Sequence, residues 1–447
     1  MKARKNVSKT GGEKMKARKN VSRREFIIAG TALTAGAGLT ILSPKWSFAS
    51  KTKEPIKLGF MSSLSGAMSA YGEQVVQVAE VTLEQINEEG GVLGREVKMV
   101  FEDDHSELKY GLQAAERLVK KHGCVMVSGH YFSNVRIAVS QQVSEPYKVV
   151  MNNYVYDEGA ICGRYYFQMS SVANQNINPL VEYLVKNRGK RWYFSGANYE
   201  WGQGSIALAK ETLKNLGGEI VGTDINPMVI NDFSSILGRI KKAKPDVVAV
   251  FQAGSPQYAF IKQFAAAGLT GKIALCSTFY DELFRANLEP AVREGFYACA
   301  NHYDVVPSKE NEIFMASLRK KYGEKGGIKF ASAAAALVTC IRIWAQAVEK
   351  AGTTNSDEVV KAQEGGPGEK YGLSWAGPQG KVTIVKENHY SVQPAHLIQS
   401  QPDGSHKLIK SWPAIEPIIP ARYGGCKASA QHGCRPLKTD CPPFPGE

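Results

Sequence analysis

The sequence lacks the short motifs that mark several common classes of enzyme. It contains no Gly-x-Ser-x-Gly nucleophile elbow, no His-Glu-x-x-His zinc motif and no phosphate-binding loop ending in Gly-Lys-Ser/Thr. Hydrolase, metalloprotease and P-loop chemistry are therefore not indicated. We expect no catalytic residue, no cofactor and no metal, and an enzyme remains only an alternative interpretation.

The net charge of the chain is small once the N-terminal segment is left out. The chain of 447 residues has 55 Lys and Arg against 42 Asp and Glu, a net charge of +13. Residues 1–49 alone hold eleven basic and two acidic residues, so the remaining chain keeps only about +4. A nucleic-acid-binding surface needs a stronger basic footprint, and we expect no nucleic-acid partner.

Residues 1–49 have the pattern of an export signal. Residues 22–27 read Ser-Arg-Arg-Glu-Phe-Ile, a twin-arginine pattern, and a small-residue site at 47–49 follows the apolar stretch 27–42. That stretch is shorter than the roughly 20 residues of a transmembrane helix. We expect cleavage after Ala49, export by the twin-arginine route and a periplasmic location, with an uncleaved anchor as the alternative. Residues 1–8 recur letter for letter at 15–22, which indicates a duplicated leader with a second usable start at Met15.

The eight cysteines include no close pair, so no zinc or haem template fits their spacing. Three of them lie in residues 421–447, a tail rich in Gly, Pro and polar residues that we expect to be disordered. An oxidising compartment would permit disulfides, but their connectivity cannot be predicted. Buried packing is the expected role of the five scattered cysteines, Cys124, Cys162, Cys276, Cys299 and Cys340.

Short apolar runs alternate with amphipathic stretches from Pro55 to about Ala300. Strands are expected at 56–60, 97–101, 125–127 and 149–151, and the rhythm restarts with 192–194, 219–222, 247–251 and 273–275. Continuous apolar strands separated by helices of ten or more residues indicate parallel sheets covered on both faces. About 400 residues are more than a single hydrophobic core normally holds, so two domains are expected. Two such series of strands and helices therefore predict an α/β fold of two doubly wound parallel-sheet lobes. Ligands bind such sheets at the carboxyl ends of the strands.

Two local patterns suggest other chemistry. Residues 201–204, Trp-Gly-Gln-Gly, follow a strand and open a helix, as a dinucleotide site would, but Ala207 replaces the third glycine of that fingerprint. Residues 102–105, Glu-Asp-Asp-His, could bind a metal, although such a stretch is more typical of a solvated turn or a helix cap. Neither pattern is specific enough to predict a site.

Further motifs occur in a specific order and spacing over residues 54–412. They include Ser-Ser-Leu-Ser-Gly at 62–66, Gly-Gly-Val-Leu-Gly-Arg at 90–95 and Trp-Ala-Gly-Pro-Gln-Gly-Lys-Val at 375–382. Together they resemble type I periplasmic binding proteins, the receptors of transporters for branched-chain amino acids, amides and urea. The resemblance implies two lobes joined by a three-crossing hinge. The first comprises residues 54–172 plus about 301–345, and the second 173–300 plus about 346–415.

The amide and urea branch of that family is the more similar. Residues 129–133, Gly-His-Tyr-Phe-Ser, match its Gly-x-Tyr-x-Ser loop, whose Tyr and Ser touch the ligand, and residues 198–201, Asn-Tyr-Glu-Trp, lie where it carries two aromatic contacts. The amino-acid branch has a carboxylate at the position of Thr278, so a zwitterionic ligand is disfavoured unless Asp281 takes its place.

A closed cleft also needs hydroxyls and flat rings to replace water around a small solute. The expected ligand-binding residues are Tyr71, Tyr131, Ser133, Tyr154, Tyr156, Tyr199, Trp201 and Thr278. For each aromatic residue the alternative is ordinary packing, and for Ser133 it is a helix N-cap.

The sequence therefore predicts a non-catalytic, monomeric substrate-binding component of an ABC transporter. It would close around a small polar molecule and deliver it to a membrane permease. The alternatives are an exported enzyme and a ligand sensor that uses the same two-lobed fold.

Overall fold

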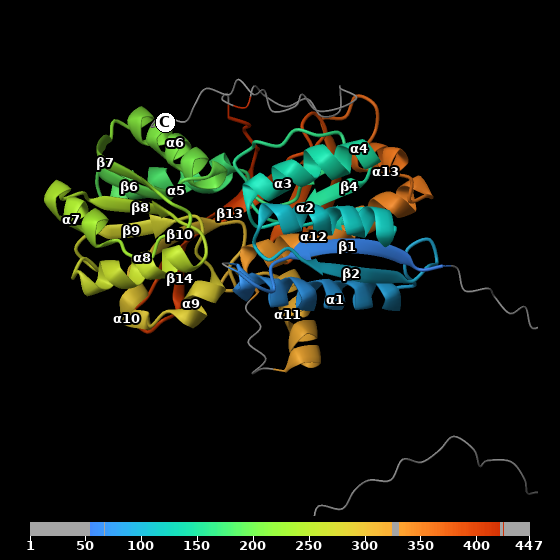
Figure 1. Cartoon of the computed structure of the whole chain (residues 1–447), viewed down its shortest axis with the longest axis horizontal. Helices are drawn as coiled ribbons and strands as arrows, with labels where there is room; N and C mark the ends of the chain where they lie inside the picture. The colour runs from blue at the N-terminus through green and yellow to red at the C-terminus, as the bar shows by residue number, and fades with distance from the viewer. Residues whose placement is uncertain (1–53, 67, 324–329, 421–422, 424–447) are drawn as a thin grey trace, which may run out of the picture. The chain divides into compact units, whose positions relative to one another are not determined.

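A computed structural model describes residues 54–66, 68–323, 330–420 and 423, which form two β-sheets with their helices (Figure 1). The predicted export signal and all of the predicted tail except Tyr423 lie outside these residues. Among the described residues, no helix is both long and apolar enough to cross a membrane.

The first sheet is entirely parallel, with strand order β2-β1-β3-β4-β5. Strands β1, β3, β4 and β5 are buried almost throughout, as strands covered by helices on both faces must be. The strands are β1 (Ile56–Ser62), β2 (Val97–Asp103), β3 (Met126–Ser128), β4 (Val150–Asn153) and β5 (Tyr166–Gln168).

The helical segments around this sheet come from two separate stretches of the chain, residues 69–147 and 309–364. Helix α1 packs against α11 and α12, while α2 packs against α3. The segments are η1 (Ser69–Tyr71), α1 (Gly72–Glu88), α2 (Leu108–Glu116), η2 (Arg117–Lys121), α3 (Ser133–Val139), η3 (Ser140–Ser144), α4 (Glu145–Tyr147), α11 (Lys309–Tyr322), α12 (Ser332–Ala351) and α13 (Ser356–Glu364). Helix α13, which the predicted bounds assign to the second lobe, packs on α12, on β4 of the first sheet and on β11 and β12 of the second sheet.

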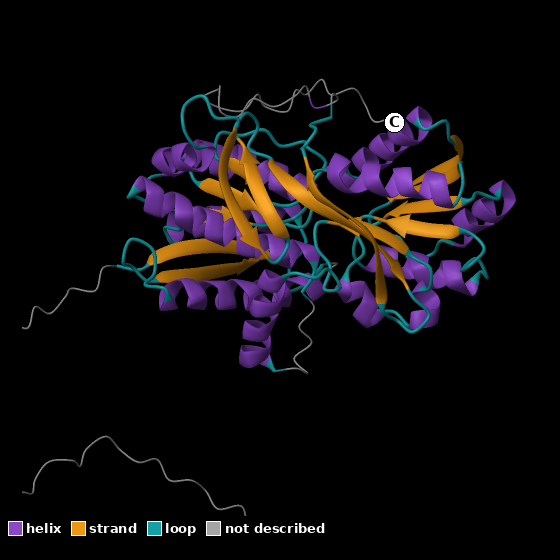
Figure 2. Cartoon of the chain, turned by 180° about the vertical axis from the view of Figure 1, so that it is seen from behind, coloured by secondary structure: helices purple, strands orange, loops and turns teal. Residues whose placement is uncertain are grey.

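The second sheet is mixed. Strands β7, β6, β8, β9 and β10 are parallel, and β13 then pairs antiparallel with β10, β12 and β14 (Figure 2). Strands β6 to β9 of the parallel part were predicted, and β10 was not. The antiparallel part forms because short turns join β11 to β12 and β13 to β14, and a short turn can only reverse the chain. The strands are β6 (Arg191–Ala197), β7 (Glu219–Asn226), β8 (Val247–Phe251), β9 (Ala274–Ser277), β10 (Tyr297–Ala300), β11 (Tyr371–Gly377), β12 (Gly380–Val385), β13 (Ser391–Ser400) and β14 (His406–Ile415).

Helices alternate with the parallel strands of this sheet, as the periodicity predicts. They are α5 (Ala173–Asn187), α6 (Glu200–Asn215), α7 (Ser234–Ala243), α8 (Ser255–Ala266), α9 (Glu282–Asn287) and α10 (Pro290–Arg293).

Buried amide side chains join the segments that run between the two sheets. The backbone oxygen of Met169 accepts hydrogen bonds from Gln379 Nε2 at 3.0 Å and from Gln393 Nε2 at 2.8 Å. Asn301 Nδ2 donates to Gln379 Oε1 at 3.3 Å. Buried polar groups need such partners, so this cluster fixes the places where the chain crosses between the sheets.

The cysteine prediction holds for four of the five scattered residues. Cys124, Cys276, Cys299 and Cys340 are buried, free thiols. The prediction is wrong for Cys162, which is only half-buried and belongs to a disulfide.

Candidate functional site

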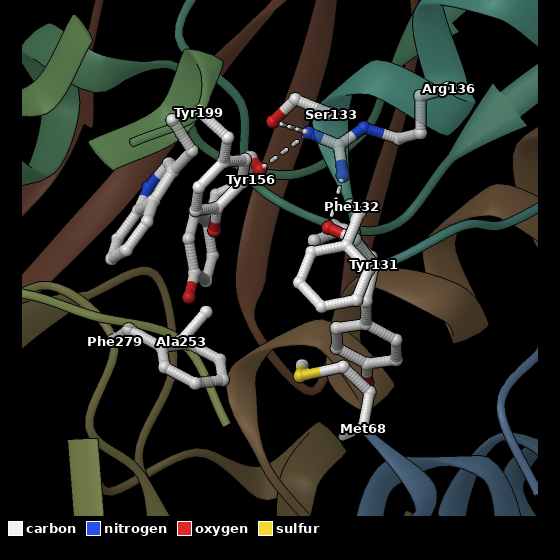
Figure 3. Close-up of a pocket in the computed structure, with 11 residues that line it drawn as sticks. Met68, Tyr131, Phe132, Ser133, Arg136, Tyr156, Tyr199, Ala253 and Phe279 are labelled. Carbon is white, nitrogen blue, oxygen red and sulfur yellow. Dashed lines mark hydrogen bonds between the residues drawn. The ribbon is translucent and has the colours of Figure 1, made fainter. Parts of the chain in front are cut away.

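A small cavity of about 10 Å³, partly open to solvent, lies beyond the carboxyl ends of strands from both sheets (Figure 3). Its walls come from the segments that follow β3, β4, β6, β8 and β9, together with Met68. This is the edge at which parallel α/β sheets bind ligands. The lining residues are Met68, Tyr131, Phe132, Ser133, Arg136, Val155, Tyr156, Tyr199, Trp201, Ala253 and Phe279.

Aromatic rings form most of the wall. The Tyr156 ring centroid lies 5.9 Å from that of Trp201 and 6.0 Å from that of Phe279, and Phe132 lies 5.8 Å from Tyr199. Figure 3 shows Tyr131 and Phe132 facing Tyr156 and Tyr199 across the cavity. These pairs bring together segments from the two sheets, so the rings can cover both faces of a flat or apolar group.

A buried guanidinium is the main polar group of the wall. Arg136 Nη1 donates to the backbone oxygens of His130 at 2.9 Å and Tyr131 at 2.6 Å, and Nη2 donates to Ser133 Oγ at 3.2 Å. Its Nε has no hydrogen-bond partner among the described residues. The side chain is 1% exposed, so its position is fixed by these contacts.

Glu158 faces this guanidinium at a longer distance. Its Oε2 accepts a hydrogen bond from Ser133 Oγ at 3.1 Å and lies 4.0 Å from Arg136 Nη2. Burial raises the pKa of Glu158 to about 8, although Arg136 opposes this rise. The raised pKa favours the neutral form of this carboxyl and so weakens its compensation of the Arg136 charge, to which Asp157 is a further acidic neighbour.

A second acidic group lies close to the aromatic wall. Asp281 is buried and caps α9, where its Oδ1 accepts a hydrogen bond from the backbone N–H of Leu283 at 3.0 Å. Burial raises the pKa of Asp281 to about 7, while the backbone N–H groups of α9 and Tyr71 lower it. Its charge in turn raises the pKa of the Tyr71 hydroxyl, for which burial is the larger cause.

The structure gathers five of the eight predicted site residues at the cavity, namely Tyr131, Ser133, Tyr156, Tyr199 and Trp201. Three do not line it. The Tyr71 ring lies 4.8 Å from Tyr131 and 5.5 Å from Phe279, and the Tyr154 hydroxyl donates to the Met61 oxygen at 3.2 Å. Thr278 is buried beside Phe279, which lines the cavity in its place.

Sequence reasoning missed several lining residues. Arg136 could have been found, because it follows Ser133 by three residues on the same helix and therefore lies on the same face. Ala253 follows the end of β8, at the sheet edge where a site was expected. Met68 and Phe279 gave no signal, since their place at the cavity depends on how distant segments fold back.

The local alternatives are resolved by backbone geometry. Ser133 is the first residue of α3 and Phe132 is its N-cap, so the N-cap alternative for Ser133 is wrong. A Cβ on Gly202 would lie 2.2 Å from the Ala197 oxygen, so this glycine permits close packing of helix α6 on strand β6. The carboxylates of Asp103 and Asp104 accept hydrogen bonds from the backbone N–H groups of His105 and Ser106, as in a turn. Asp104 is not solvated, however, because it is fully buried and its Oδ2 lies 2.8 Å from Nε2 of the buried His130.

Comparison with known proteins decides the family. Residues 55–405 match the family described as periplasmic binding protein. The chain belongs to this family. A Leu/Ile/Val-binding protein, BraC3, of Rhizobium johnstonii is 31% identical over 215 residues, which are 45% of this chain and 56% of the relative. The first two curated relatives are thus matched over only about half of their length, 56% and 55%. Homolog 1 of Leu/Ile/Val-binding protein in Brucella suis is 26% identical over 358 residues, 77% of this chain and 89% of that protein.

Solved structures show the same type I, two-lobed fold. A solute-binding protein of an ABC transporter from Rhodopseudomonas palustris, in complex with 3,4-dihydroxybenzoic acid, superposes with a TM-score of 0.73 at 22% identity, covering 81% of this chain and 98% of that one. The branched-chain amino acid transporter substrate-binding protein LivJ of Streptococcus pneumoniae, in complex with isoleucine, gives a TM-score of 0.70 at 20% identity, covering 81% and 100%. The predicted fold class is therefore confirmed for this family member.

Proposed function

We propose that this chain is the periplasmic substrate-binding component of an ABC transporter for a small polar solute of the branched-chain amino acid, amide or urea class. It binds the solute between its two lobes, closes over it and delivers it to a membrane permease. The twin-arginine export route, the lobe bounds and the monomeric state are parts of the same proposal, and no catalytic step is involved.

The observation that carries this proposal is the composition of the cavity wall. Five residues expected to bind a ligand converge on it from segments far apart in the sequence, in a chain of the periplasmic binding protein family. In this structure the cavity has room for only about one water, so a solute of amino-acid size requires the wall to open before it enters. Tyr71, Tyr154 and Thr278 do not line the cavity, and we propose that they pack against the aromatic residues that do.

The charges at the wall extend the proposal to the ends of the ligand. Arg136 and the hydroxyl of Ser133 would bind a carboxylate or carbonyl oxygen, because the raised pKa of Glu158 weakens its compensation of the guanidinium charge. Asp281, behind Tyr71, is the group that could balance an ammonium, so an amino acid stays in the proposed class.

An aromatic acid is a second candidate ligand, and one observation favours it. Six of the eleven lining side chains are aromatic, and a buried cation stands beside them. Structural neighbours solved with 3,4-dihydroxybenzoate and with 4-hydroxybenzoate have the same fold. Stacking on rings plus one ion pair would suffice for such a ligand.

A thermal-shift screen tests the proposal and separates the ligand classes. Branched-chain amino acids, short amides, urea and hydroxybenzoates are added in turn to the purified chain, and a ligand should raise the melting temperature as RT ln(1 + [L]/Kd) requires. Ser133→Ala should then weaken binding by roughly ten- to a hundredfold in calorimetry, because a buried polar partner is worth about 1–3 kcal/mol.

Ser140→Ala is the matched control, since Ser140 is equally buried in the next helical segment and does not line the cavity. Equal affinities of the two variants would remove Ser133 from the site. No shift with any member of the panel would argue against the proposed class of ligand.

A further inference from the structure

A second cluster of ionisable side chains lies apart from the cavity lining. Glu282 begins α9, Asp304 follows β10, and His406 begins β14. One oxygen or nitrogen from each lies within 4.8 Å of the others, and in the described part of the chain no other three such residues are grouped in this way.

Several atoms of this cluster are buried without a partner. Glu282 is 3% exposed and His406 is 5% exposed. Glu282 Oε1 accepts the backbone N–H of Asp304 at 2.9 Å, but Oε2 and both ring nitrogens of His406 have no hydrogen-bond partner among the described residues. Buried polar atoms are nearly always paired, so these three atoms have unused capacity to bind a ligand.

Asp304 is already held in a fixed orientation. Its Oδ1 accepts a hydrogen bond from Arg285 Nη1 at 3.0 Å, and its Oδ2 accepts a second from Arg285 Nη2. A carboxylate has about four lone-pair sites and can bind a further group while it accepts these bonds. Carboxylates that bind metals are commonly hydrogen-bonded in this way, and Arg285 would have that orienting role.

We propose that Glu282, Asp304 and His406 bind a divalent transition-metal ion, with zinc as the best-suited species. Two carboxylate oxygens and one imidazole nitrogen are ligands that zinc accepts, whereas magnesium and calcium prefer oxygen ligands alone. Zinc lies about 2.0–2.2 Å from such atoms, so a single ion between these three groups reaches all of them after small side-chain rotations.

A bound proton is the rival explanation of the unpaired atoms. Burial raises the pKa of Glu282 well above its ordinary value, and the charges of Asp304 and Asp281 raise it further. A proton on Oε2 could then be donated to a neighbour. Burial lowers the pKa of His406 to about 3, so its imidazole is neutral, the form that binds metals. The two explanations differ in whether the chain takes up zinc at this site.

The ion would connect three separate segments of the second half of the chain. It would join the start of α9 and the start of β14 to the loop after β10, close to the segment of Phe279 that lines the cavity. This inference does not rest on the transport function, because it concerns a different set of side chains.

Zinc titration of the metal-free full chain tests the proposal. Calorimetry with zinc sulfate should show that the wild type binds one zinc ion. The same titration of Glu282→Gln should show this binding strongly weakened. We expect this variant to weaken zinc binding by more than about 100-fold, since loss of even an outer partner typically weakens it about 10–100-fold.

The matched control is Glu364→Gln, at a carboxylate–imidazole pair in which both imidazole nitrogens already have partners. His389 Nε2 lies 2.9 Å from Glu364 Oε1, and Arg164 also pairs with Glu364. This variant should bind zinc as the wild type does. Cobalt(II) provides a second measurement on the wild type alone. Its absorption spectrum distinguishes a site of oxygen and nitrogen ligands, such as the proposed one, from a site formed by cysteine thiolates elsewhere in the chain. Zinc binding that is equal in the wild type and Glu282→Gln, or cobalt spectra of thiolate sites only, would overturn the assignment in favour of the proton.

Discussion

Glu158→Gln should change how the stability of this protein depends on pH. Glu158 is 1% exposed, and burial raises its pKa from 4.5 to about 8. Below pH 4.5 the carboxyl is neutral in both the folded and the unfolded chain. Between pH 4.5 and 8 the folded chain retains a proton that the unfolded chain has released, so the free energy of unfolding falls as the pH rises. Above pH 8 this contribution stays constant.

The magnitude follows from the size of that window. Each pKa unit corresponds to about 1.4 kcal/mol, so the range from pH 5 to 8 could lower the free energy of unfolding by at most about 4 kcal/mol. We expect roughly 1–3 kcal/mol, because Asp157 beside it is also buried with a raised pKa and titrates together with it. Glutamine keeps an acceptor for Ser133 Oγ but cannot ionise.

Urea denaturation of both proteins at pH 5 and pH 8 measures the effect. The wild type should lose roughly 1–3 kcal/mol more than Glu158→Gln between these pH values. Glu102→Gln is the control, because Arg117 holds the pKa of Glu102 below its ordinary value and this group is therefore ionised throughout the range in both states. If the wild type and Glu158→Gln lose stability equally, the pKa of Glu158 is not raised in the folded chain and the weakened compensation of the Arg136 charge is refuted.

Three further predictions concern export, closure and the aromatic wall. Replacing Arg23 and Arg24 together by Lys should leave the precursor in the cytoplasm, and cell fractionation that finds it undiminished in the periplasm would contradict the twin-arginine assignment. Saturating ligand should reduce the radius of gyration in solution scattering through hinge closure, and an unchanged radius would argue against it. Trp201→Ala should weaken ligand binding in calorimetry by at least tenfold, because it removes a large ring from the wall. Normal binding by a folded variant would make Tyr199 the next candidate.

The sequence was most informative where a pattern repeats locally. Apolar runs such as 247–251 predicted β8 with its observed bounds, because a strand buried on both faces must be apolar at every position. The loop at 131–133 and the pair at 199 and 201 were expected at the site from the resemblance to a known family. In the structure each follows a strand end and lines the cavity. The scattered cysteines were assigned correctly only where burial alone decides their role.

The sequence by itself thus determined the fold class, the alternation of strands and helices and five residues of the cavity wall. Only the tertiary structure decided that Phe279 and not Thr278 lines the cavity, that Arg136 lies beside a buried Glu158, and that Glu282, Asp304 and His406 meet. The physical reason is the range of the interactions. Periodicity and strand ends are patterns within a few consecutive residues, so they can be read from the sequence. Burial, pKa shifts and the grouping of charged atoms depend on contacts between segments, some of which are more than 100 residues apart.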